Sequence, residues 1–198
     1  MKNKLFFLLI LCITKGFSQN QVINIIDDNG EPIHGAYYKD IDSLLNPFVG
    51  RYVFDNGQKR LKFVLQKMIH SSMSGVYFED LIVGEFEYSE NGVLITGTLN
   101  NFNYGWINGA KHNISGNLIV DKPSGLCDDC LPGEKALHVG YVDPYAHAIG
   151  SFTIRRMVMN GQDAIHIDIG YEVGTRQAGE PVVPLSIRGR EFVLIKQP

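Results

Sequence analysis

The sequence predicts an all-β protein, an antiparallel meander that closes into a β-barrel, with a β-sandwich as the alternative. Beyond residue 47, apolar residues recur with a period of two and not 3.6. Asn-Gly pairs at residues 56–57, 91–92 and 160–161 separate such runs, and this dipeptide is a strong hairpin signal. The 21 Gly and 8 Pro leave almost no long stretch without a helix breaker. We favour the barrel because closure leaves no exposed strand edge.

The first 18 residues have the build of a secretory signal peptide. Lys2 and Lys4 precede an unbroken apolar run over residues 5–13, and Gly16 and Ser18 supply small residues before a cleavage site. This run is too short for a transmembrane helix, which needs about 20 residues. We therefore expect cleavage after Ser18, export to the periplasm or the medium, and no transmembrane segment in the mature chain.

The charge of the mature chain argues against nucleic-acid binding. The signal segment contains three lysines and no acidic residue, so its removal changes the formal net charge from −3 to −6. Proteins that bind nucleic acids gather Lys and Arg into a basic surface, and here these residues are scattered.

After the signal segment, we expect an N-terminal arm over residues 19–46 and a single barrel domain over residues 47–198. Within the arm, Asp40 or Asp42 is placed to cap a short turn that Pro47 then stops. No repeat of fixed period and no low-complexity linker divides the chain.

Four segments of the barrel domain read as hairpins. The first three, residues 51–69, 76–99 and 151–173, turn at the Asn-Gly pairs, and the weaker fourth, residues 184–195, turns near Gly189. In the third, His166 and Asp168 share one strand face while the alternating isoleucines take the other. Such a His-Asp pair either orients a general base or is simply solvent-facing, and the second is the commoner case.

Cys127 and Cys130 are the two cysteines that remain after the signal segment is removed. In an oxidising compartment an even pair most simply forms a disulfide, which here would clip a small loop. A metal site made by Cys127, Cys130 and His138 is the alternative. A redox site is disfavoured because Asp128 and Asp129 lie between the cysteines and would raise their thiol pKa values.

An aromatic-rich segment follows the cysteine loop. Tyr141, Tyr145 and His147 flank an Asp-Pro turn, and aromatic side chains at the mouth of a barrel are suited to hold a ligand. We take these three as candidate ligand-binding residues. Acidic residues at positions 79, 85 and 87 alternate along a strand and read as its outward polar positions.

Two segments of the chain resemble a known family. GAYYKDIDSLLNPFVGRYVFDNG (residues 35–57) and FEDLIVGEFEY (residues 78–88), followed by NGV, are similar to an uncharacterised family of small exported proteins from Gram-negative bacteria. The resemblance covers most of the mature chain and implies no activity, because the family is a domain of unknown function. Gly50-x-Tyr52 also resembles, distantly, the Gly-x-Trp opening of lipocalin-like barrels, which implies a lipocalin-like shape and no particular ligand.

These observations predict an exported, non-enzymatic β-barrel binding module for a small apolar ligand, a glycan or a protein partner, with no cofactor. A structural or interaction protein of the cell envelope without a ligand cavity is one alternative, and a metal- or carboxylate-dependent hydrolase is the other. No Gly-x-Ser-x-Gly elbow is present in the sequence. Whether the protein is an enzyme therefore stays open, and we expect that it is not.

Overall fold

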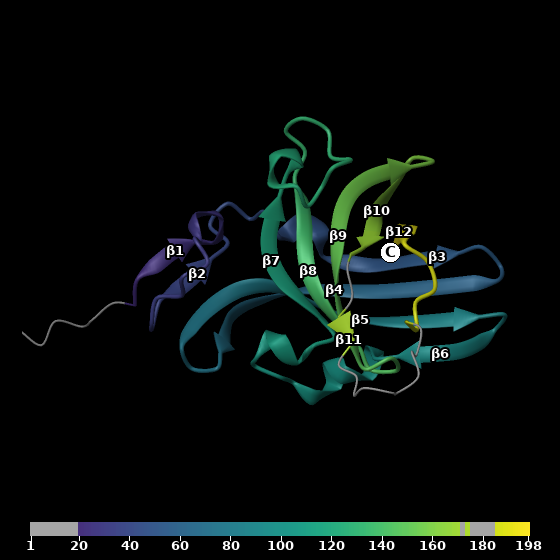
Figure 1. The fold of residues 1–198 in the computed structure, drawn as a ribbon, viewed down its shortest axis with the longest axis horizontal. Coiled ribbons are helices and arrows are strands. Elements are labelled where there is room, and N and C mark those ends of the chain that lie inside the picture. The colour runs from purple at the N-terminus through teal and green to yellow at the C-terminus, as the bar shows by residue number, and fades with distance from the viewer. Residues whose placement is uncertain (1–19, 171–172, 175–184) are drawn as a thin grey trace, which may run out of the picture.

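Eight antiparallel strands close into a barrel in the computed structural model, which describes residues 20–170, 173–174 and 185–198 (Figure 1). Each barrel strand pairs with the next barrel strand along the chain, including β5 with β7. The last strand, β12, pairs back with the first, β3. The strands are β3 (Gly50–Asp55), β4 (Lys59–Met73), β5 (Tyr77–Glu90), β7 (Ile114–Val120), β8 (Ala136–Asp143), β9 (Ala148–Met159), β10 (Gln162–Ile169) and β12 (Glu191–Gln197). The predicted all-β meander and barrel are confirmed, and the sandwich alternative is not adopted.

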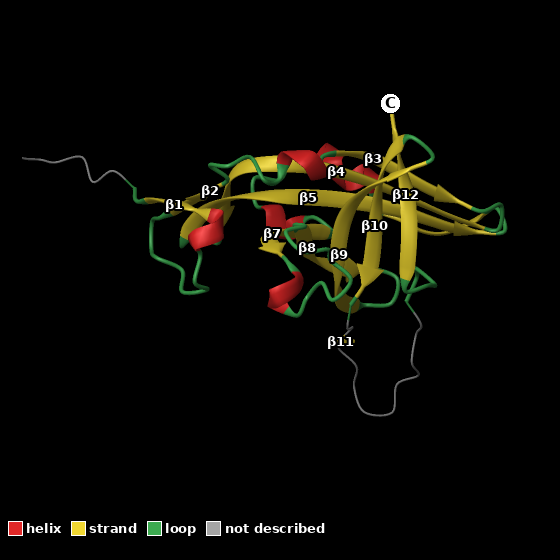
Figure 2. Cartoon of the chain, turned by 90° about the horizontal axis from the view of Figure 1, so that it is seen from above, coloured by secondary structure: helices red, strands yellow, loops and turns green. Residues whose placement is uncertain are grey.

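The outer edge of β5 carries further short strands at its two ends. β1 (Val22–Asn24) and β2 (Tyr37–Lys39) run parallel beside its start, and β6 (Val93–Gly97) pairs with its end. β11 (Val173–Gly174) adds to β9. Both views show β1 and β2 projecting past one end of the barrel (Figure 1, Figure 2).

The helical elements of the described residues are short 3₁₀ turns that connect or flank the strands (Figure 2). They are η1 (Ile25–Asp27), η2 (Asn46–Phe48), η3 (Leu99–Tyr104), η4 (Gly109–Lys111) and η5 (Lys122–Ser124). Before η2, Asp40 accepts hydrogen bonds from the backbone N–H groups of Leu44 at 2.7 Å and Leu45 at 3.1 Å. Of the two capping candidates, Asp40 is therefore the one that holds this turn.

The hairpin turns follow the predictions in two cases. Asn91-Gly92 and Asn160-Gly161 have positive φ at both residues, as a two-residue type I′ turn requires. The first turn lies one residue later than predicted: Asn56 N–H bonds to Lys59 O at 3.2 Å, and of the Asn56-Gly57 pair Gly57 alone has positive φ. The Asn56 side chain instead accepts backbone N–H groups, which holds its backbone outside the left-handed region.

The fourth predicted hairpin is wrong. Residues 185–190 form no strand, and β12 begins only at Glu191. β12 pairs with β10 on one side and with β3 on the other, so it is the strand that closes the barrel back onto its beginning. Gly189 precedes this strand in the described chain and does not reverse it.

The buried apolar side chains of the described residues form one large cluster in the barrel interior. Tyr141 stacks on Phe152 with ring centroids 4.3 Å apart, and Phe152 lies 5.3 Å from Phe63. Gly150 faces the Tyr141 ring, and a Cβ at this position would collide with it. In the described residues, apolar side chains occupy the barrel interior. The polar side chains that a ligand can reach therefore lie on the outer faces of the strands.

The predicted signal peptide, residues 1–18, lies outside the described residues. In the part of the chain that the structure describes, no helix is long and apolar enough to cross a membrane.

Candidate functional site

The segment between β7 and β8, residues 121–135, forms a loop that is closed by a disulfide between Cys127 and Cys130. Both cysteines are buried against Val120 and Ala136, the end of β7 and the start of β8. The disulfide predicted from the sequence is therefore present. This disulfide loop, as we name residues 121–135, stands at the top of Figure 1.

Two hydrogen bonds tie the disulfide loop to the outer face of β9. Thr153 Oγ1 donates to the backbone oxygen of Leu126 at 3.1 Å, and Arg155 Nη1 donates to the backbone oxygen of Asp129 at 3.0 Å. The loop is thereby held over the outer face of the barrel and does not stand free in solvent.

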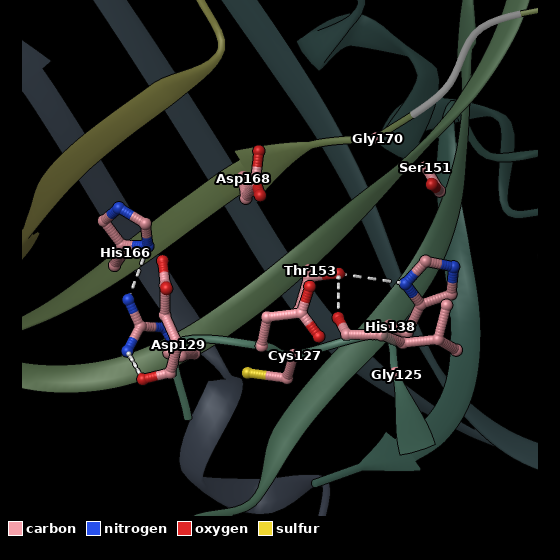
Figure 3. Close-up of a pocket in the computed structure, with 12 residues that line it drawn as sticks. Gly125, Cys127, Asp129, His138, Ser151, Thr153, His166, Asp168 and Gly170 are labelled. Carbon is pink, nitrogen blue, oxygen red and sulfur yellow. Dashed lines mark hydrogen bonds between the residues drawn. The ribbon is translucent and has the colours of Figure 1, made fainter. Parts of the chain in front are cut away.

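Between the disulfide loop and strands β8–β10 lies an open cleft of about 450 Å³, which we call the disulfide cleft (Figure 3). The strands contribute their outward side chains to it, because the residues next to them, such as Ile165 and Ile167, are buried in the interior. The polar residues that line it are Asp128, Asp129, His138, Ser151, Thr153, Arg155, His166 and Asp168. The predicted sharing of a face by His166 and Asp168 is confirmed.

The histidine His138 has one orientation set by its neighbours. Its Nδ1 lies 3.1 Å from Thr153 Oγ1, and that hydroxyl already donates its proton to Leu126. Thr153 must therefore accept from His138 Nδ1–H, which leaves Nε2 as the acceptor. Burial lowers the pKa of His138 from its ordinary value, so the neutral ring is favoured.

The other histidine of the cleft does not form the His-Asp pair that strand register suggested. His166 Nδ1 lies 3.4 Å from Arg155 Nη2 and must accept from it, and His166 Nε2 lies 3.6 Å from a carboxylate oxygen of Glu191. Among the described residues, no hydrogen bond joins His166 to Asp168. The arrangement therefore does not orient His166 as a general base through Asp168.

Three aspartates of the cleft keep their carboxylates free. Asp128, Asp129 and Asp168 are exposed, and their side chains make no ion pair or hydrogen bond within the described residues. Arg155 is the cation among the lining residues, and its guanidinium is engaged with a backbone oxygen and with His166. The cleft is therefore negatively charged when its histidines are neutral.

The alternative metal site of Cys127, Cys130 and His138 does not have the ligands it needs. The two sulfur atoms are bonded to each other and are not thiolates, which are the form that binds zinc. No group of three or more His, Cys, Asp or Glu side chains within residues 20–170, 173–174 and 185–198 lies close enough together to hold a metal ion.

The three candidate ligand-binding residues after the cysteine loop are not brought together. Tyr141 lies in the barrel interior with 1% of its surface exposed. Tyr145 and His147 lie on the β8–β9 turn, where both are exposed, and neither lines the disulfide cleft. The buried carboxylate of Asp143 holds this turn by accepting the N–H groups of Tyr145 and Ala146. The β8–β9 turn is thus exposed but is not hollowed into this cleft.

A second group of polar and aromatic residues was not anticipated from the sequence. Glu85 and Glu79 were expected to face solvent, but both are buried: Glu85 contacts the segment after β6, and Glu79 accepts a hydrogen bond from the side chain of Asn117 in β7. Glu85 bonds to His112, which lies beside Trp106. The aromatic residues within positions 102–106 were the one sequence signal for this group. Nothing in the sequence indicated that this segment contacts β5.

Among known proteins, no curated protein and no solved structure matches this chain. One family model, described as a family of unknown function (DUF6705), matches residues 1–197. This span covers nearly the whole chain, including the complete barrel and both of the regions described above. The chain therefore belongs to this family of unknown function, DUF6705.

Proposed function

We propose that the protein is an exported binding module that holds an extended, basic peptide segment of a partner protein in the disulfide cleft. The observation that carries this proposal is the set of unpaired carboxylates of Asp128, Asp129 and Asp168 along a cleft of about 450 Å³. Complementary charge steers association and fixes the register of a partner.

The spacing of the acidic groups favours an extended ligand. Within the described residues no three such side chains converge closely enough for one ion, so they are suited to separate cationic groups. The strand hydroxyl of Ser151 and the Nε2 atom of His138 add further hydrogen-bonding groups along the same cleft. A peptide with alternating Lys or Arg side chains presents this combination of charge and backbone polarity.

We favour a ligand on the outer face over a small apolar ligand inside the barrel, because aromatic and aliphatic side chains of the described residues gather in the interior. A hydrolase is not favoured either. The Thr153 hydroxyl is committed to Leu126, and His166 is committed to Arg155, so neither is arranged as an activated nucleophile and base.

Export is part of this proposal. A disulfide in a small loop is typical of proteins from oxidising compartments, and the lysines and apolar run of residues 1–18 supply the matching signal. Mass spectrometry of the protein purified from its producing cells tests this point. We expect a chain that starts at Gln19 and is two hydrogens lighter than its reduced form; an uncleaved chain with free thiols would contradict export.

Calorimetric titration of the folded protein with trilysine tests the proposed ligand class, with triglutamate as the control of opposite charge. We expect binding of trilysine alone, weakened by added salt. The double variant Asp129→Asn/Asp168→Asn should bind roughly 2- to 30-fold more weakly, from about 0.2–1 kcal/mol for each exposed ion pair.

A matched control lies on the same strand as Asp168. Asp163 is exposed and does not line the disulfide cleft, so Asp163→Asn removes the same single charge as Asp168→Asn but elsewhere, and it should leave trilysine affinity unchanged where Asp168→Asn weakens it. Equal losses from both substitutions would show attraction to net charge alone. Equal losses, or no trilysine binding, would overturn the proposal and favour a structural role without a ligand.

A further inference from the structure

A second cleft lies on the outside of the barrel, away from the disulfide loop. The segment with η3 and η4 folds against the outer faces of β4 and β5, at the bottom of Figure 1, whereas the disulfide loop stands at the top. It leaves a cleft of about 220 Å³ whose walls include Gln66, Met68, Val83, Phe102, Trp106 and His112. We call this the aromatic cleft. It shares no lining residue with the disulfide cleft.

A buried hydrogen bond fixes the imidazole at the wall of the aromatic cleft. His112 has 5% of its surface exposed, and its Nδ1 lies 2.8 Å from Oε1 of Glu85, whose surface is 0% exposed. Glu85 also accepts from the N–H of Asn113 at 3.4 Å and from the side chain of Asn101 at 3.4 Å. A carboxylate can only accept, so it holds the proton of His112 on Nδ1.

The other nitrogen of His112, Nε2, is not held by any hydrogen bond from the described residues. Within the residues that the structure describes, no hydrogen bond reaches Nε2, although the side chain is almost fully buried and lines the aromatic cleft. Nε2 is not among the fully buried side-chain atoms that lack a hydrogen bond, so solvent or a ligand can reach it from the cleft. In the neutral tautomer that Glu85 selects, this atom accepts a hydrogen bond, as from a hydroxyl group.

Aromatic rings form the apolar part of the same cleft. Trp106 meets His112 edge-on at 5.1 Å between ring centroids, and Phe102 lies 5.3 Å from His112. Tyr104, which is 67% exposed, stacks on Trp106 with 5.2 Å between the ring centroids. The cleft therefore combines flat apolar surface with a fixed hydroxyl acceptor.

The charge and size of the aromatic cleft limit the class of ligand further. Lys67 also lines it, but its ammonium group is already held by Asp40 at 2.6 Å and Asn46 at 3.0 Å, so no free cation is present for an acidic ligand. The volume of about 220 Å³ is below the roughly 300–1,000 Å³ of sites for drug-sized ligands, so it suits one ring.

We propose that the aromatic cleft binds one neutral pyranose ring of a carbohydrate. The C–H face of the sugar packs on the Trp106 indole, one hydroxyl donates to His112 Nε2, and the Gln66 amide bonds to a second hydroxyl at the rim. Glu85 acts as a positioning residue, because it touches the imidazole and not the sugar. This site goes beyond the peptide site proposed for the disulfide cleft and does not depend on it.

The fluorescence of Trp106 tests the proposal directly, because it is the one tryptophan in the chain. The full protein is titrated with the methyl β-pyranosides of glucose, galactose and mannose up to about 100 mM, which would saturate a site with a dissociation constant near 1 mM. We expect a saturable change with at least one of them. No saturable change with any of the three would overturn the proposal.

Variants assign the response to the cleft. Gln66 is exposed, so Gln66→Ala should fold normally and weaken the sugar about 2- to 13-fold, as for one hydrogen bond. Glu85→Gln keeps an oxygen acceptor for His112 Nδ1–H and should retain the sugar response, whereas Glu85→Leu should lose it. Sugar affinity unchanged in Gln66→Ala and in Glu85→Leu would contradict the assignment.

The peptide proposal and the carbohydrate proposal can be tested independently of each other. The variant Asp129→Asn/Asp168→Asn should keep the sugar response, and Gln66→Ala should keep trilysine binding, because the two clefts share no lining residue. A sugar response that disappears with the two aspartates would place the carbohydrate in the disulfide cleft and overturn the inference about Trp106.

Discussion

The two clefts use charge in opposite ways. In the disulfide cleft, the carboxylates of Asp128, Asp129 and Asp168 are exposed and unpaired within the described residues, and the loop above them is held by a covalent bond and two backbone contacts. In the aromatic cleft, the carboxylate of Glu85 is buried and bonded to His112, and this bond itself holds the covering segment. Charge in the first is available to a ligand, whereas charge in the second contributes to the fold.

This difference predicts opposite responses to substitution and to salt. Exposed charges contribute little to stability and are screened by ions, so changes in the disulfide cleft should alter binding more than folding. The buried carboxylate of Glu85 is screened far less, and loss of its partner His112 leaves that charge unpaired in the interior. Substitutions of the buried Glu85–His112 pair in the aromatic cleft should therefore change stability as well as binding.

The largest expected effect is the loss of the buried pair. His112→Leu should lower the free energy of unfolding by about 3–5 kcal/mol, because it leaves the carboxylate of Glu85 buried without its partner. Chemical denaturation measures this value. The double variant Glu85→Leu/His112→Leu should lose less than His112→Leu alone, since no unpaired charge remains.

The matched comparison for the buried pair is Asp168→Asn in the disulfide cleft, which should change the free energy of unfolding by no more than about 0.5 kcal/mol. A loss below about 1 kcal/mol for His112→Leu would show that the buried pair does not hold the segment.

The next effect concerns the covalent bond of the disulfide loop. Cys127→Ala/Cys130→Ala should cost about 2 kcal/mol or less, because the bond closes a very small loop. Relative to wild type, the same double variant should lose a larger fraction of its trilysine affinity than of its stability, since Asp128 and Asp129 lie inside that loop. Denaturation and calorimetry measured on the same variant compare the two. Unchanged trilysine affinity would show that the bond does not shape the cleft.

The smallest effect is the pH dependence contributed by His138. Its pKa is lowered in the folded state by burial, so on acidification the unfolded chain takes up this proton first. The stability linked to His138 is present above the ordinary pKa of about 6.5 and is lost as the pH falls through the folded-state value.

Denaturation of wild type and His138→Gln between about pH 5 and pH 7.5 measures this contribution, and the variant should show the shallower dependence on pH. Titration of the ring by NMR provides the control. A His138 pKa at or above its ordinary value would contradict the assigned burial effect.

Local patterns predicted those parts of the fold that depend on neighbours in sequence. The alternation around His166 placed it on one strand face with Asp168, and the presence of one cysteine pair in a chain expected to be exported indicated the disulfide between Cys127 and Cys130. Asn56 shows the limit even of a local signal, because its side chain took over the backbone bonds of the turn and displaced the reversal by one residue.

Contacts between distant segments could not be predicted from the sequence. Glu85 looks like an outward strand residue, and only the return of the segment around His112 over β5 buries it. Tyr141 looked like a residue of a binding loop, but strand register turns it into the interior, where Phe152 covers it. Both outcomes depend on which segments pack together, for which the chain carries no local signal.

The most direct test of the account is NMR mapping of trilysine on the isotope-labelled protein. If the disulfide cleft is the binding site, shifts should be confined to the disulfide loop around Asp129 and to the outward residues of β8–β10, including His138 and Asp168. Signals of Phe63 in the interior and of Trp106 in the aromatic cleft should stay unchanged. Shifts in the barrel interior, or shifts scattered over acidic residues such as Asp163, would contradict the claim that this cleft is the functional site.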